Sequence, residues 1–258
     1  MPDDLFTLIP AKAPVRPIIA NLPHSGLQVP SDIAKNFTSK QLRSLPNSDW
    51  HLQPLYDFLP ELGITVLQAN YSRYVVDLNR ATKPPLFGSF WSAVVPEQTA
   101  FKAPIYLEKP NEEEVRSRIQ TYYDPYHSQL ANLLSQTISN FGKAYLFDLH
   151  SFMGLITEDI CLGNGAGKTC SAALLNQVHQ SFAQTYEVVN NKVFTGGFIT
   201  RHYGQQPSVE ALQIELRYTN YLPPDQLEID TIPTYKSPQF DLAKQKLKQA
   251  FQDILTAL

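Results

Sequence analysis

Short apolar runs alternate with helical patterns along most of the chain. Runs rich in aliphatic and β-branched residues predict strands at 16–22, 64–69, 143–151, 159–162, 187–190 and 209–216. Apolar residues recur at helical spacing over 111–133, 169–183 and 240–258. Because strands that alternate with helices favour a parallel sheet, we expect one α/β domain over residues 1–258. We expect its fold to be a three-layer α/β/α sandwich around a mostly parallel, mixed sheet.

Three further stretches are less regular. Residues 72–80 (SRYVVDLNR) read as another strand with charges at both ends, and a helix is expected to begin near Pro54 and end near Leu59. Residues 82–110 hold five prolines and few periodic positions, which predicts a long irregular excursion. Such an excursion in a compact domain is usually a binding loop or a lid.

The composition narrows the possible partners. The chain has 43% hydrophobic and 17% charged residues, a net charge of -3 and no basic stripe, which argues against nucleic acid and favours a small-molecule ligand. The opening MPDDLFTLIP lacks a positive flank and a long apolar core, so we expect neither a signal peptide nor a membrane span, and a cytoplasmic location. Cys161 and Cys170 form no C-x-x-C motif and are expected to be free interior thiols. The oligomeric state is left open.

Candidate chemistry begins at the end of the strand predicted at 143–151. Side chains alternate along a strand, so Asp148 and His150 share one face near its carboxyl end, where open α/β sheets place their ligands. A lone histidine is more often satisfied by a neighbouring backbone group. Here, however, the stretches around His24, Asp49 and Glu215 also place metal-binding or acid/base side chains where apolar segments begin or end.

His24, Asp49 and His150 together form a possible metal-ligand set. A catalytic zinc ion takes three nitrogen or oxygen ligands and leaves a fourth position for water. The three residues form no compact motif, and Asp49 reads equally well as a carboxylate that satisfies backbone N–H groups at a helix entry. His51 is the alternative third ligand, or a partner that orients one.

The predicted strand 209–216 carries the candidate proton-transfer group. Its alternation places Gln213, Glu215 and Arg217 on the face opposite Leu212, Ile214 and Leu216. That polar face is either solvated or turned toward the site. If Glu215 faces the metal, it can take a proton from bound water and pass it to a leaving amine.

Several polar residues are candidates to bind an anionic substrate. A guanidinium group matches a carboxylate bidentately, which singles out Arg73, Arg80 and Arg201, and Asn79 could add a hydrogen bond. Asp77 is the expected internal counter-charge for one of these arginines. The alternative for each arginine is a partly exposed salt bridge of little consequence.

Six short motifs, in order, resemble the N-formylglutamate amidohydrolase family. They are PHSG at 23–26, SDWH at 48–51, SRYVVDLNR at 72–80, DLHS at 148–151, GGFITRHYG at 196–204 and QIELR at 213–217. The resemblance runs from about Pro17 to Leu222. It implies a fold similar to the zinc carboxypeptidases and a zinc-dependent hydrolase. The implied reaction cleaves N-formyl-L-glutamate to formate and L-glutamate at the end of histidine breakdown.

The resemblance also implies roles for single residues. His24, Asp49 and His150 match the ligands of one zinc ion per chain, and Glu215 matches the general base. Asn79 and Arg80 resemble the pair that grips a substrate carboxylate in carboxypeptidases. Arg73, Arg201 and His202 resemble substrate contacts, and Arg73 is given a catalytic role in polarising the scissile carbonyl. His51, Asp77 and Asp148 are expected to orient the metal ligands.

Two features leave the substrate open. Lys168 stands in a Gly-rich loop where an uncharged residue is expected, and the Pro-rich excursion is expected to be particular to this chain. The alternatives are therefore an amidase of different acyl preference, acting on acyl-amino acids or peptides, and a non-catalytic binder of amino-acid carboxylates on the same scaffold.

Overall fold

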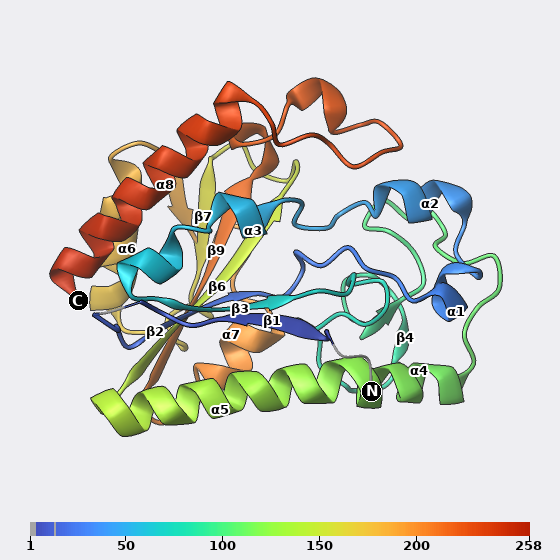
Figure 1. Cartoon of the computed structure of the whole chain (residues 1–258), viewed down its shortest axis with the longest axis horizontal. Coiled ribbons are helices and arrows are strands. Elements are labelled where there is room, and N and C mark those ends of the chain that lie inside the picture. The colour runs from blue at the N-terminus through green and yellow to red at the C-terminus, as the bar shows by residue number, and fades with distance from the viewer. Residues whose placement is uncertain (1–3, 13) are drawn as a thin grey trace.

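A central β-sheet separates two layers of helices (Figure 1). The computed structural model describes residues 4–12 and 14–258. Helices α6 (Ala172–Ala183) and α8 (Pro238–Ala257) cover one face of the sheet, and the long helix α5 (Asp124–Phe141) runs along the other. The predicted three-layer α/β/α architecture is confirmed.

The main sheet has seven strands in the order β1-β3-β2-β6-β9-β7-β8. Their bounds are β1 Phe6–Ile9, β2 Ile18–Leu22, β3 Thr65–Ala69, β6 Ala144–Phe152, β7 Ile160–Gly163, β8 Val188–Asn190 and β9 Val209–Arg217. Only the β1–β3 and β7–β9 pairs are antiparallel, so the sheet is mixed and mostly parallel, as predicted. The central strands β2, β6 and β9 run in parallel, which brings their carboxyl ends to one edge.

The smaller elements lie around this sheet. The remaining helices are α1 Ser31–Ala34, α2 Ser39–Ser44, α3 Leu52–Leu55, α4 Glu112–Arg118 and α7 Phe198–Tyr203. A two-stranded sheet joins β4 (Phe87–Gly88) and β5 (Val95–Pro96) inside the otherwise irregular excursion. Helix α4 begins with a capping box formed by Asn111 and Glu114. A π-helical turn at Ile119–Tyr123 separates α4 from α5, just before Pro125 in the first turn of α5.

Each helical layer buries its own apolar core against the sheet. On one side Phe251 of α8 packs in a cluster with Leu212 of β9 and Phe147 of β6. On the other side Leu130 of α5 belongs to the cluster that contains Leu146 of β6. Full burial of such side chains contributes about 1.5–3 kcal/mol each. Because both faces of β6 are covered, its polar side chains lie inside the protein.

Three local predictions are wrong. Residues 72–80 form turns instead of a strand, because the carboxylate of Asp77 accepts the N–H of Asn79 and competes with a strand ladder. The helix expected from Pro54 to Leu59 is the short α3, followed by a separate 3₁₀ turn at Leu59–Leu62. Cys161 is a buried free thiol as expected, but Cys170 is only half-buried.

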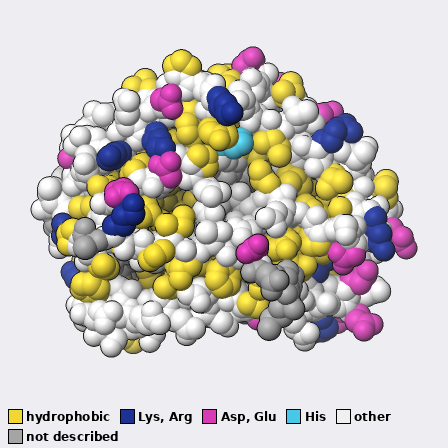
Figure 2. Space-filling model, in the orientation of Figure 1, with side chains coloured by type: hydrophobic (Ala, Val, Ile, Leu, Met, Phe, Trp, Pro, Cys, Tyr) yellow, Lys and Arg dark blue, Asp and Glu magenta, His cyan; other side chains and the backbone are white. Residues whose placement is uncertain are grey.

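The surface carries both signs of charge. On the face shown in Figure 2, acidic and basic side chains are interspersed. Within residues 4–12 and 14–258, no helix combines the length and the apolar character needed to cross a membrane. We expect no signal peptide in the opening stretch of the chain. The first three residues of that stretch lie outside the described residues.

Candidate active site

Four distant segments meet at the carboxyl edge of the central strands. His150 of β6 lies opposite Glu215 of β9 in the parallel register. His24 follows β2 by two residues, and its carbonyl oxygen accepts the backbone N–H of Asp49 at 3.0 Å. The four side chains all line one cavity and are nearly fully buried. Sequence positions almost 200 residues apart thus share one site.

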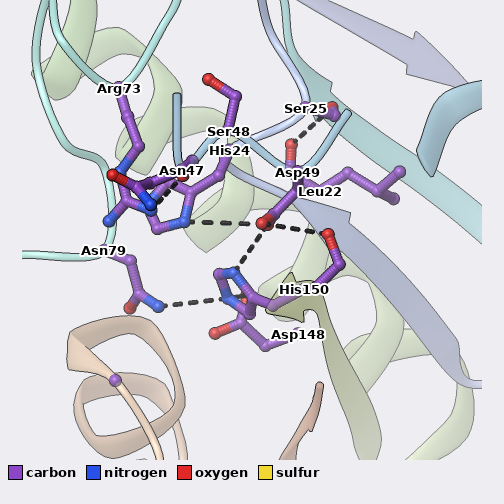
Figure 3. A network of polar contacts seen from close by, with 12 residues as sticks. Leu22, His24, Ser25, Asn47, Ser48, Asp49, Arg73, Asn79, Asp148 and His150 are labelled. Atoms are coloured by element: carbon purple, nitrogen blue, oxygen red, sulfur yellow. Dashed lines mark hydrogen bonds and ion pairs between the residues drawn. The ribbon is translucent and has the colours of Figure 1, made fainter. Parts of the chain in front are cut away.

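Asp49 lies between two imidazole rings (Figure 3). Its Oδ2 is 3.1 Å from Nδ1 of His150 and 3.8 Å from Nδ1 of His24. One ligand atom from each of the three residues lies within 4.8 Å of the other two. Two inward-facing nitrogens and a carboxylate are a donor set that zinc accepts.

The outer nitrogen of each imidazole is held by a second carboxylate. Nε2 of His24 lies 2.6 Å from Oδ1 of Asp77, and Nε2 of His150 lies 3.1 Å from Oδ1 of Asp148. Metal-bound histidines commonly donate their other ring N–H to a carboxylate, which fixes the tautomer and leaves the inner nitrogen free to coordinate. The residues present therefore fit a divalent metal ion such as zinc.

Burial sets the protonation of these groups. Burial, together with the nearby Arg73, lowers the pKa of His24 to about 4, so its ring is neutral at neutral pH. Burial alone would raise the pKa of Asp77, but Arg73 and His24 hold it well below the usual value. Asp148 and Asp49 raise the pKa of His150 against the effect of burial. A metal ion must displace that proton to bind His150.

Ser151, the last residue of the DLHS motif, and Tyr221 support Asp49 from the other side, although the sequence indicated no role for either. The Ser151 hydroxyl donates to Oδ1 of Asp49 at 3.3 Å, and the Tyr221 hydroxyl donates to Oγ of Ser151 at 2.9 Å. Only the position of Ser151 next to His150 could have pointed to this chain of hydrogen bonds.

Glu215 has one free carboxylate oxygen. Its Oε1 accepts a hydrogen bond from Nε2 of Gln213 at 2.7 Å, whereas Oε2 is buried without a partner. Burial, opposed by His150 and assisted by Asp49 and Asp148, raises the pKa of Glu215 to about 7. A carboxylate of this kind can exchange a proton near neutral pH.

The three candidate arginines differ in their partners. Arg73 is buried and pairs with Asp77 at 2.6 Å, and it donates a further hydrogen bond to the carbonyl of Asn47. Arg80 is half-buried, and its hydrogen bonds go to the carbonyls of Asn79 and Phe90. Among the described residues no carboxylate forms a salt bridge with Arg80, so it brings an unpaired positive charge to the cavity.

Arg201 also lines the cavity but is exposed. It donates to the carbonyl of Gly196 and to the hydroxyl of Thr195, and no acidic partner is found for it in the part of the chain that the structure describes. Two cationic groups without a salt bridge therefore face the same space. Two carboxylates on one ligand would match them.

Three predicted site residues lie differently from what the sequence suggested. Asn79 lines the cavity, but its amide contacts Nε2 of His150 at 3.1 Å and accepts the N–H of Ile199 at the start of α7. The exposed ring of His202 stacks on Phe198 and is absent from the cavity lining. His51 contacts the carbonyl of Pro233 and is no member of the ligand cluster, so Asp49 is the third candidate ligand.

Helix α7 was not predicted because Gly196 and Gly197 precede it. Gly196 has a φ of +110°, which favours glycine. A Cβ on Gly197 would lie 2.3 Å from the amide of Asn79, so only glycine allows this close approach. The two glycines thus bring α7 and Arg201 against the site.

The chain matches the family model described as N-formylglutamate amidohydrolase over residues 16–222. It is 35% identical over 219 residues to an N-formylglutamate deformylase of Pseudomonas aeruginosa, covering 80% of this chain and 82% of that protein. It is 33% identical over 253 residues to the N-formylglutamate deformylase of Pseudomonas putida, covering 93% and 92%.

Solved structures agree with this match. The crystal structure of an N-formylglutamate amidohydrolase from Ralstonia eutropha JMP134 superimposes with a TM-score of 0.81 at 25% identity, covering 98% of this chain and 96% of that one. A gene product of Agrobacterium tumefaciens has a TM-score of 0.72 at 16% identity, covering 98% and 95%, which shows the shared fold.

Proposed function

The chain belongs to the N-formylglutamate amidohydrolase family, and we propose on that basis that it hydrolyses N-formyl-L-glutamate to formate and L-glutamate. One observation carries the proposal: a single cavity holds the buried ligand cluster and the unpartnered Oε2 of Glu215. From the family resemblance we place the reaction in the cytoplasm, at the end of histidine breakdown.

We assign one zinc ion per chain to His24, Asp49 and His150. When bound, zinc supplies a Lewis acid that lowers the pKa of a coordinated water to about 7. Asp77 and Asp148 orient the two imidazoles toward it, as their contacts with the Nε2 atoms allow.

Glu215 moves the proton. Its Oε2 accepts a proton from the attacking water while the water oxygen bonds to the formyl carbon. The same oxygen then delivers the proton to the amide nitrogen as the carbon–nitrogen bond breaks, which releases formate and the free amine. Gln213 holds the other carboxylate oxygen during both transfers.

The three arginines bind the negative charges of the substrate. N-formyl-L-glutamate carries two carboxylates, and we assign the α-carboxylate to Arg80 and the γ-carboxylate to Arg201, because neither has a salt bridge of its own among the described residues. Arg73 uses three of its five N–H donors on Asp77 and Asn47. The two that remain can stabilise the oxyanion that develops on the formyl oxygen.

The test is formate release by the purified protein. Protein that contains about one zinc ion per chain by elemental analysis should release formate from N-formyl-L-glutamate, lose that activity in a chelator, and regain it when zinc is restored. Zinc-loaded protein that releases no formate would refute the proposal. Equal activity with and without the chelator would refute the metal assignment alone.

A further inference from the structure

Four large apolar side chains are exposed at the mouth of the cavity. The exposed fractions are 56% for Trp91, 72% for Phe101, 62% for Leu155 and 43% for Val193. All four line the same cavity as Glu215. Clustered exposed apolar groups that adjoin a site usually contact a ligand or a partner, because water solvates them poorly.

These residues continue two built aromatic walls. Trp91 packs edge-to-face on Phe90 at 5.1 Å, and the guanidinium of Arg73 lies over the Phe90 ring at 4.4 Å. In the second wall Phe152 and Phe194 pack at 5.0 Å and belong to a small apolar cluster. Phe90, Trp91, Phe152 and Phe194 all line the cavity that Glu215 lines.

N-formyl-L-glutamate leaves these walls without a partner. The cavity volume is about 960 Å³, near the upper end of the roughly 300–1,000 Å³ typical of pockets for drug-sized ligands. The substrate is far smaller, and beyond two methylenes it offers no apolar group. Both of its carboxylates lie on the amine side of the scissile bond, where the proposed function assigns them to Arg80 and Arg201. The acyl group is therefore the part of the substrate that can contact the apolar walls.

We propose that the site also hydrolyses N-acyl-L-glutamates whose acyl group is a medium-length alkyl chain, and this proposal rests on the proposed function. Water adds its oxygen to the acyl carbon, the carbon–nitrogen bond breaks, and Glu215 transfers the proton to the departing amine. The products are a fatty acid and L-glutamate, and water is the only co-reactant. Each methylene buried against the walls improves binding by up to about fourfold.

The first test compares N-formyl-, N-acetyl-, N-hexanoyl- and N-decanoyl-L-glutamate below their micelle-forming concentrations. The expected KM falls at least about tenfold from the acetyl to the decanoyl compound. Phe101→Ser and Leu155→Ser should each lower kcat/KM for the decanoyl compound at least five times more than for the formyl compound. Leu107→Ser is the matched control, because Leu107 is 73% exposed but does not line the cavity. Leu107→Ser should change kcat/KM for neither the decanoyl nor the formyl compound.

A second measurement reports binding without turnover. The chain has two tryptophans, of which Trp50 is buried and Trp91 stands at the mouth. In the Glu215→Gln variant, N-decanoyl-L-glutamate should shift the tryptophan emission to shorter wavelength in a saturable way. N-formyl-L-glutamate should not, and Trp91→Phe should abolish the shift.

The outcomes separate the two proposals. Formate release with neither a chain-length effect nor an emission shift overturns the alkyl-chain proposal and leaves the proposed function standing. If neither the formyl nor the decanoyl compound is hydrolysed, the proposed function is overturned and this extension with it. Formate release without any hydrolysis of the decanoyl compound overturns the alkyl-chain proposal alone. Hydrolysis of the decanoyl compound at equal rates in the wild type, Phe101→Ser and Leu155→Ser overturns the assignment to these walls.

Discussion

The amide of Gln213 donates to Oε1 of Glu215 at 2.7 Å and, at its other end, accepts the backbone N–H of Gly197. One buried side chain thus links the carboxylate to the segment that leads into α7. This link leaves Oε2 of Glu215 as the only carboxylate oxygen of that residue free to face the cavity. The proposed proton transfer by Glu215 would therefore use this single oxygen.

Glu215→Gln should leave the fold and the metal in place and remove most turnover. The amide oxygen of the new side chain can still accept the bond from Gln213, but the group cannot accept a proton. Loss of general acid–base catalysis typically lowers kcat by a factor of about 10²–10⁴. Formate release and zinc content should be measured on the same sample. Unchanged zinc with kcat within threefold of the wild type would contradict the role of Glu215.

The central part of this site could be predicted from the sequence. The two-residue period of β6 places Asp148 and His150 on one face, and that of β9 does the same for Gln213 and Glu215. Burial of both strands on two faces explains why their polar residues lie inside the protein. Local periodicity was sufficient here because parallel strands end together at one edge.

The parts that depend on tertiary contacts could not be predicted. Residues 72–80 have the composition of a strand, yet Asp77 is bound by His24, Arg73 and the N–H of Asn79, and these contacts favour turns. Helix α7 begins with an N–H bonded to Asn79, more than a hundred residues earlier. The edge strand β1 was missed because it is only four residues long and pairs antiparallel.

Removing Arg80 and Arg201 should have different effects on two substrates. Arg80→Ala should raise KM about 10- to 100-fold for both N-formyl-L-glutamate and N-formyl-L-glutamine, because hydrogen bonds between charged groups are worth about 1.5–3 kcal/mol. Arg201→Ala should raise KM only for N-formyl-L-glutamate, which alone has the γ-carboxylate. Steady-state kinetics on the two substrates measure this.

The control for these variants is Arg116→Ala, since Arg116 pairs with Glu112 on the exposed surface of α4. It should leave both KM values unchanged. The reverse pattern, with Arg201→Ala affecting both substrates and Arg80→Ala only one, would exchange the two assignments. An unchanged KM in Arg80→Ala would remove Arg80 from the binding site.

Asp148→Asn should lower the affinity of the folded protein for zinc. Oδ1 of Asp148 lies beside Nε2 of His150, and loss of such an orienting carboxylate typically costs about 10- to 100-fold in metal affinity. Competition against a fluorescent chelator measures the affinity. Asp159→Asn is the matched control, because Asp159 accepts the backbone N–H of Glu187 and does not line the cavity. Equal affinity in the two variants would contradict the orienting role.

His127 should make the folded state less stable as the pH falls. Its ring lies between Tyr123 and Tyr203, with Nε2 against the carbonyl of Leu78 and Nδ1 against the Tyr203 hydroxyl. Burial lowers its pKa from 6.5 to about 4, although the Leu78 carbonyl opposes this. Between these two pH values the unfolded chain binds a proton that the folded chain does not. The free energy of unfolding therefore falls as the pH drops through this range.

The measurement is the difference in pH dependence between the wild type and His127→Gln. Glu215, whose pKa is raised, contributes the opposite sign over part of this range, and His24 contributes the same sign as His127, so only a difference isolates His127. In urea titrations, the free energy of unfolding should fall between pH 7 and pH 4 by roughly 2 kcal/mol more in the wild type than in His127→Gln. One pKa unit corresponds to about 1.4 kcal/mol, and the expected difference is reduced because the half-buried ring retains some solvent contact. The variant is expected to be less stable at pH 7, since it loses ring packing, but to have the shallower pH dependence. Parallel curves for the two proteins would show that His127 titrates normally in the folded state.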